Sequence, residues 1–348
     1  MTWLTWRQFR VQAIAAAVAM AAFAILLAAT GPHLASQYAA SGLTGCRPAS
    51  CANLALGFLA HVSTGGTYAV LDLLGVMIIL LTPAVIGLFW GAPLIARELE
   101  TGTCALAWNQ SVTRTRWLAV KLTIYGLAAM TVTEGLSLMH AWWAAPIGRA
   151  VGQLGGTHAD LAAQFGFVLS RFSPLSFASQ GIAPLGYAAF GFALGAMAGA
   201  LIRRTVPAMA LTLVIFAAIQ IAMPLWVRPH LFPASHTVVS VTAEESLRPD
   251  NIPGHPGAWL LSSQTINAAG QPVYAAPAAC PAPVPVKGAA DGEGGYLACL
   301  ASHGIREEFV YQAASRYWAF QVTETAIYLA LALALAGLCF RRLSRRLS

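Results

Sequence analysis

Three polar side chains interrupt otherwise apolar stretches and are the first candidates for chemistry, namely Glu134, Gln220 and Glu324. A carboxyl group in hydrocarbon is costly, so residues of this kind often mark a transport path or a gate. Hydrogen bonds between helices and contact with the outer membrane surface are the alternative explanations. Together with His140, the two carboxyl groups are also what a membrane-embedded enzyme would use.

The second candidate is a charged segment between two apolar runs, residues 96–121, with the sequence ARELETGTCALAWNQSVTRTRWLAVK. Gly102 can end a helix in the left-handed conformation, and Thr103 can accept the first amide hydrogen bonds of the next helix. Thr113 is suited to cap the helix that follows. The pattern predicts a chain that leaves the membrane, forms a short surface helix and re-enters. The alternative is a solvated hairpin whose charges only keep it out of lipid.

This segment resembles the loop between the second and third spans of ABC-2 type transporter permeases. In that family, a Glu-x-Glu-x-Gly-Thr stretch, an apolar turn and a Ser/Arg-containing re-entry form the coupling helix that docks on the ATPase subunit. The residues here that match this pattern are Glu98, Glu100, Gly102, Thr103, Leu106, Ser111, Arg114 and Lys121. The resemblance implies a coupling helix over 97–116, with Arg97 and Trp108 also at the contact. The Arg-Arg-Thr-x-Pro turn at 203–207 is similar to that of actinobacterial permeases of this type.

Composition places the chain in a membrane. It is 57% hydrophobic and only 9% charged, whereas about a quarter of a typical soluble domain is charged. Twelve of the 20 Lys and Arg residues lie in four short pieces, which are the N-terminal segment, the 97–121 loop, the 203–204 turn and the C-terminal tail. The positive-inside rule therefore predicts a plasma-membrane protein with both termini cytoplasmic. The same distribution argues against nucleic acid as the partner of this basic chain.

Six apolar runs are long enough to cross a bilayer. They cover residues 11–30, 70–89, 117–142, 184–202, 207–226 and 317–340. Residues 1–10 place Trp3, Trp6 and Phe9 at helical spacing, which predicts an amphipathic helix in the interface, although a signal peptide is the competing interpretation. Residues 31–69 and 146–183 are expected to be outer loops. The fold class is thus an all-α polytopic membrane protein with six transmembrane helices.

The longest soluble piece, residues 227–316, separates the first five spans from the last and divides the chain into three predicted domains. These are 1–226 in the membrane, 227–316 outside, and 317–348 with the last span and a basic tail. Strand-like runs at 237–241 and 258–261 and the prolines of 277–285 predict a small extracellular domain with little helix. In the fourth span, Gly191, Gly195 and Gly199 form a small-xxx-small ladder. Such a ladder favours close helix packing, unless it only reflects a chain rich in small residues.

Four cysteines fall in the predicted outer parts of the chain, where disulfides form. Four cysteines allow three connectivities. Local pairing as Cys46–Cys51 and Cys280–Cys299 closes the smallest loops and is preferred here. A zinc site is the alternative, but no His is recognised at finger-like spacing, so no metal is expected.

The chain has no Gly-x-x-x-x-Gly-Lys-Ser/Thr loop, so neither ATP binding by that route nor enzymatic activity is expected of it. The resemblance implies the fold of the G-subfamily-like exporters, in which two permeases, here expected to be a homodimer, meet in the lipid. Two ATPase subunits, which carry the ATP and Mg, dock below. The implied function is export of an amphiphile such as a drug, lipid or peptide. The rival hypothesis is a membrane anchor or sensor that presents the 227–316 domain.

Overall fold

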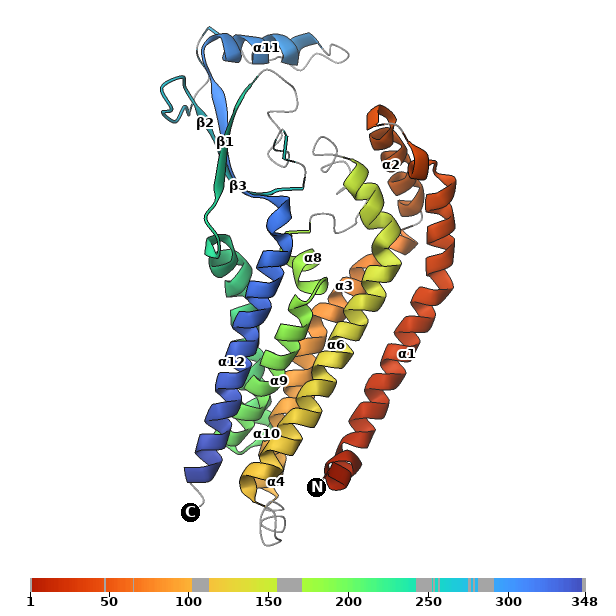
Figure 1. Ribbon diagram of the computed structural model, residues 1–348, viewed down its shortest axis with the longest axis vertical. Helices are drawn as coiled ribbons and strands as arrows, with labels where there is room; N and C mark the ends of the chain where they lie inside the picture. The colour runs from red at the N-terminus through yellow and green to blue at the C-terminus, as the bar shows by residue number, and fades with distance from the viewer. Residues whose placement is uncertain are drawn as a thin grey trace.

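The protein is a long helical bundle with a small β-sheet at one end and both chain termini at the other (Figure 1). We call these the sheet end and the terminal end. The computed structural model describes residues 2–46, 48–64, 66–101, 113–154, 171–241, 252, 254–255, 257–274, 277, 279–280 and 291–345. The part of the segment 96–121 that lies between 102 and 112 is therefore outside the described residues.

Six helices in the described part of the chain are long and apolar enough to cross a membrane, as the sequence predicts. The first four are α1 (Thr2–Ala40), α3 (Thr67–Ile86) continued by η2 (Gly87–Gly91) and α4 (Ala92–Glu100), α6 (Arg114–Gln153) and α9 (Ala183–Ile202). The last two are α10 (Thr205–Ala222) continued by η4 (Met223–Val227) and η5 (Arg228–His230), and α12 (Tyr317–Arg345). The described part of the expected amphipathic segment, residues 2–10, is helical and continues without a break into the rest of α1.

Helix α9 is the centre of the bundle. In its most apolar 18-residue stretch 78% of the residues are buried, against 11–33% in the corresponding stretches of the other five spans. A Cβ atom added at Gly191, Gly195 or Gly199 would lie 2.2–2.6 Å from a backbone carbonyl oxygen of the continuous α3–η2–α4 helix. No side chain fits in that space, so the two backbones are in direct contact along this ladder.

The predicted outer loop 31–69 is largely helical, which corrects the sequence analysis. Helix α1 continues to Ala40, and α2 (Pro48–Ser63) follows. The apolar residues of α2 recur at helical spacing, and Phe58 and Leu59 pack against α1 and α6 in one buried cluster. Gly, Ser and His residues between these positions hid that spacing in the sequence. Helix α6 likewise extends beyond the predicted end of the third span.

The sheet end carries three antiparallel strands in the order β1-β3-β2, from the described part of 227–316. They are β1 (Ser235–Ser240), β2 (Trp259–Ile266) and β3 (Arg306–Gln312). Both strand-like runs noted in the sequence are strands, whereas β3 and the 12-residue helix α11 (Asp291–Ser302) were missed. The described part of this domain thus has one α-helix of 12 residues beside its three strands. Helix α11 packs Leu297 and Leu300 onto Ile305, at the start of β3, which gives this domain its own small core.

Candidate functional site

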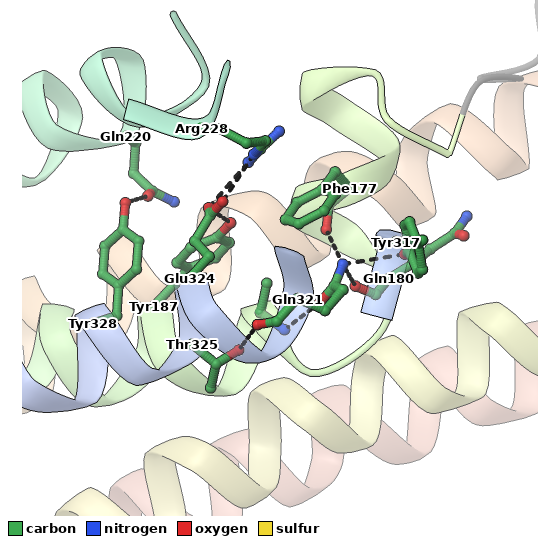
Figure 2. Close-up of polar contacts among 11 residues, drawn as sticks. Phe177, Gln180, Tyr187, Gln220, Arg228, Tyr317, Gln321, Glu324, Thr325 and Tyr328 are labelled. Atoms are coloured by element: carbon green, nitrogen blue, oxygen red, sulfur yellow. Dashed lines mark hydrogen bonds and ion pairs between the residues drawn. The ribbon is translucent and has the colours of Figure 1, made fainter. Parts of the chain in front are cut away.

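A buried polar cluster lies on one face of α12, near the sheet end of the bundle (Figure 2). Glu324 and Thr325 lie three and four residues after Gln321, and four and three before Tyr328, so the four share one side of the helix. All four are buried. The sequence of α12 thus directs a polar stripe into the bundle, where each group needs a partner.

Glu324 finds its partners on two other elements. Both carboxylate oxygens accept from Arg228, with Nε 2.8 Å from Oε2 and Nη2 3.0 Å from Oε1. The Tyr187 hydroxyl donates to Oε1 at 2.5 Å. The guanidinium of Arg228 also lies 3.8 Å from the centre of the Phe177 ring. A buried carboxylate and a buried guanidinium are tolerated because they neutralise each other through two hydrogen bonds.

Gln321 organises the turn between α8 (Pro174–Ser179) and α9. Its Oε1 accepts from the backbone N–H groups of Ile182 and Ala183 at 3.1 and 2.9 Å. Its Nε2 donates to the carbonyl oxygens of Phe177 and Gln180, both at 3.1 Å. The first amides of a helix have no partner within it, so this side chain supplies the missing acceptor at the start of α9.

A further bond joins α12 to α10, where the Tyr328 hydroxyl donates to Oε1 of Gln220 at 2.6 Å. Gln220, Tyr187, Arg228 and Glu324 together border a cavity of about 130 Å³ whose other walls are mainly apolar. The charges of the cluster cancel, and it does not combine a nucleophile with a neighbouring base. The arrangement therefore suits the binding of a polar group and not the breaking of bonds.

The structure brings together two of the three intramembrane residues singled out in the sequence. Gln220 and Glu324 line the same cavity, whereas Glu134 is on α6, outside the cluster, and its half-buried side chain has an Oε2 without a partner among the described residues. Arg228 and Tyr187 were missed. The fifth span was expected to end near Trp226, but η4 and η5 carry the helical path to His230, so Arg228 lies against the spans and not in a loop.

A second buried pair joins α3 to α6. Nε2 of His140 lies 3.3 Å from Oδ1 of Asp72, an ion-pair distance without the angle of a hydrogen bond. His140 fills the space beside Gly75, where a Cβ atom would lie 2.2 Å from the imidazole. The sequence analysis grouped His140 with Glu134 and Glu324 and did not consider Asp72, which lies near the beginning of α3.

The predicted coupling residues begin at the terminal end of the bundle. Glu98 makes an ion pair with Nζ of Lys121 on α6. Oε2 of Glu100 accepts from the backbone N–H and the hydroxyl of Thr205, at 3.2 and 2.8 Å, where α10 begins. Both carboxylates therefore hold α4 against its neighbours, a role that the sequence did not reveal.

The rest of the predicted coupling segment is only partly visible. Arg97 is exposed on α4, and Arg114 is the first residue of α6. Gly102, Thr103, Leu106 and Trp108 lie outside the described residues.

Both predicted disulfides are present, Cys46–Cys51 and Cys280–Cys299. The second lies beside an imidazole, because Nδ1 of His303 is 3.7 Å from Sγ of Cys280. Cys280, Cys299 and His303 are side chains of metal-ligating types, and their possible ligand atoms all lie within 4.8 Å of one another. The sequence analysis recognised no His at finger-like spacing beside these cysteines, although His303 follows Cys299 by four positions. While the disulfide is formed, neither sulfur can act as a thiolate ligand.

Comparison with known proteins connects this geometry to a family. Residues 17–228 match the family model described as ABC-2 membrane transporter related. The match extends from α1 to Arg228, so it includes the first five spans, the ladder of α9 and part of the polar cluster. No curated protein and no solved structure matches the chain.

Proposed function

This chain belongs to the ABC-2 membrane transporter related family, a family of membrane subunits of ABC transporters, and we propose that it is the transmembrane subunit of an exporter. The observation that carries the proposal is the family match over five of six membrane-length helices. ATP binding and hydrolysis are assigned to a separate ATPase subunit, because the chain has no phosphate-binding loop of the common type.

The proposed cargo is an amphiphile such as a drug, lipid or peptide. Support comes from the cluster around Glu324, whose charges cancel and which borders a mainly apolar cavity. Such a site has no excess charge with which to select a small ion. Exposed apolar side chains on the spans, for example Leu81 and Val214, offer a route for an apolar tail along the helix surfaces.

The proposed assembly contains two copies of this chain and two ATPase subunits in the plasma membrane. Both termini lie at one end of the bundle (Figure 1), and the cations of the 97–121 loop, the 203–204 turn and the C-terminal tail support placing that end in the cytoplasm. The 227–316 domain is then extracellular, an oxidising space in which the Cys280–Cys299 disulfide persists.

Coupling is proposed to pass through residues 97–116. In this arrangement the ATPase pushes on the segment that begins with α4, and the spans tilt in response. The bonds from Glu98 to Lys121 and from Glu100 to Thr205 support the proposal, because they join this segment to α6 and α10. A displacement of α4 would therefore reach two further spans.

The test is ATPase activity and co-purification of the ATPase encoded beside this chain. We expect Glu100→Lys to reduce both, because it reverses a charge in the coupling segment. Thr205→Val is the matched control, since it removes the hydroxyl bond to Glu100 and leaves the charge of the segment unchanged. Gly102→Val should also reduce coupling, because a β-branched residue resists the positive φ expected at that position.

The outcomes separate an exporter from an anchor. Loss of ATPase binding in Glu100→Lys alone supports docking, and equal losses in both variants assign Glu100 to holding α10. Full coupled hydrolysis and transport in Glu100→Lys and Gly102→Val would contradict the coupling role. An anchor or sensor would have no ATPase to lose, so failure of the wild-type chain to co-purify with one would overturn the proposed function.

A further inference from the structure

The guanidinium of Arg228 has more donors than partners. The side chain is 1% exposed, and Nε and Nη2 donate to Glu324, while Nη1 is buried and has no partner among the described residues. A buried donor of a charged group that lacks an acceptor is costly, so a protein rarely keeps one without an occupant for the site.

That guanidinium borders the cavity of about 130 Å³ described above. The volume is well above the roughly 10–15 Å³ that a single water needs. Gln220 lies in the same wall and uses its carboxamide oxygen to accept from Tyr328, which leaves its amide nitrogen as a second donor. The cavity thus combines two N–H donor groups with the apolar side chains of Leu80 and Met223.

The charges select what can occupy the cavity. Arg228 is already neutralised by Glu324, whose oxygens accept three hydrogen bonds from Arg228 and Tyr187. An anion would therefore meet no net positive charge and would lie close to a carboxylate. A cation would have to compete with Arg228 for Glu324. A neutral group with an acceptor oxygen fits both donors without either penalty.

The cavity also has an exposed apolar edge. Pro174 and Leu175 of α8 line it and are exposed, and Leu225, next to the lining residue Pro224, is exposed as well. An apolar tail attached to the bound group can leave along this edge into lipid. The volume holds a headgroup fragment and not a whole amphiphile.

We propose that this cavity binds the carbonyl oxygen of a neutral amphiphile, with Arg228 Nη1 and the Gln220 amide as donors. The proposal deepens the proposed function, because it names the polar group that the exported amphiphile would present. Two sources share this chemistry, an ester of a lipid and the backbone of an apolar peptide. Binding requires no ATPase, so it is tested separately from transport.

The experiment uses the purified full chain and native mass spectrometry to measure retained ligand. The probes are monoolein and its ether analogue 1-O-oleylglycerol, which differ only in the carbonyl group. We expect the wild-type chain to retain the ester about tenfold better, as a charge-assisted hydrogen bond predicts. Arg228→Lys, which keeps the positive charge beside Glu324 but loses the fork of donors, should lower this preference to about twofold or less.

Two variants block the cavity without touching the ion pair. Leu175→Trp closes the exposed edge, and Ala178→Leu fills the interior, since Ala178 also lines the cavity. Both should lose the ester preference. Leu127→Trp and Ala218→Leu are the matched controls, because these residues are exposed and do not line it. Leu175→Trp is at the surface, so it remains informative if Ala178→Leu does not fold.

Equal retention of ester and ether by the wild-type chain would overturn the proposal, as would a preference that survives both blocking variants. In either case the cavity does not select the carbonyl group. N-acetyl-trileucine methylamide distinguishes the sources, since competition with monoolein indicates peptide carbonyls and its absence indicates a lipid ester. An ester preference in a chain that couples to no ATPase would overturn the proposed function alone.

Discussion

The bundle carries a charged cluster at each end, and the two are built differently. At the sheet end, Glu324 and Arg228 are at most 1% exposed and make two mutual hydrogen bonds, and Glu324 also accepts from the Tyr187 hydroxyl. At the terminal end, the side chain of Lys121 is 4% exposed and that of its partner Glu98 is 17% exposed. Breaking a fully buried pair is strongly destabilising, and contact with solvent lowers that cost. We therefore expect the first pair to remain fixed and the second to be the easier of the two to open.

The neighbours of the two clusters support the same distinction. Arg228, Glu324 and Tyr187 come from three different spans, and the adjacent Gln321 fixes the start of α9. Glu98 instead lies in the last turn of α4, close to the segment proposed to meet the ATPase. We therefore expect the sheet end to be the more rigid of the two ends and the terminal end to be the one where helices move relative to one another.

The largest expected loss of stability comes from breaking the buried pair of Arg228 and Glu324. Arg228→Met leaves Glu324 without its cation in apolar surroundings, which should lower the free energy of unfolding by about 3–5 kcal/mol. The measurement is reversible unfolding of the full chain in mixed micelles. The double variant Arg228→Met/Glu324→Gln should recover most of the loss, since it removes the unpaired charge. A loss below about 1 kcal/mol in the single variant would contradict the assignment of this pair as a fixed element.

A somewhat smaller effect is expected from Gln321→Leu. The change leaves the N–H groups of Ile182 and Ala183 without their acceptor and should cost about 2–3 kcal/mol, within the range for buried unsatisfied groups. Hydrogen exchange at these two amides should rise at least about tenfold, which corresponds to about 1.4 kcal/mol. Thr325→Val is the control, because in the described part of the chain its hydroxyl donates to the Gln321 carbonyl oxygen, within α12. Equal protection in both variants would mean that α9 does not depend on this side chain.

The contrast between the ends is measured directly by two double-mutant cycles. We expect a coupling energy of about 1 kcal/mol for Glu98→Gln with Lys121→Met, against about 3 kcal/mol for Arg228→Met with Glu324→Gln. The reason is that Glu98 keeps contact with solvent, and Lys121 also lies 4.6 Å from the centre of the Trp117 ring. Equal coupling energies in the two cycles would remove the distinction between a fixed and a movable end.

The smallest expected effect is on the pH dependence of the stability of the sheet, and it comes from Glu307 in β3. Burial raises the pKa of Glu307 above its usual value of 4.5, and its Oε2 has no partner in the described residues. The folded state thus holds this proton more tightly than the unfolded state. Stability contributed by the protonated form is present below pH 4.5 and is lost as pH rises through the raised pKa.

Glu307→Gln should remove that pH dependence and slow exchange of the β1–β3 amides at neutral pH. The corresponding gain in the free energy of opening should be less than about 1 kcal/mol. The measurement is hydrogen exchange of the full chain at pH 5 and pH 8, corrected for intrinsic rates. Glu308→Gln is the control, since its carboxylate faces the exposed His236. An unchanged pH dependence in Glu307→Gln would contradict the role of burial.

The spans, both disulfides and two of the strands were predictable from sequence, because length, apolar content and local cysteine spacing suffice for them. Helix α2 was missed because its apolar positions alternate with small and polar residues. Strand β3 was missed because Arg306, Glu307 and Glu308 suggest a solvated loop, although β3 is the central strand. In both cases tertiary packing outweighs local composition.

The site was predictable only in part, for a physical reason. Glu324 and Gln220 stand out because a polar group in an apolar helix is expensive wherever it lies. Their partners depend on the path of the chain, since Arg228 reaches Glu324 only because the π-helical turn η4 extends α10. Gln321 caps a helix that begins 138 residues earlier in the chain. No local pattern encodes either contact.

The glycine ladder of α9 limits how the protein can move. Along it, backbone meets backbone, and no side chain lies between that could change rotamer and allow the two helices to slide. Helix α9 and the α3–η2–α4 helix must then travel as one rigid body. A push on α4 would act on the far end of this body as on a lever, and the pivot has to lie outside the ladder, at the contacts of this body with α6, α10 or α12.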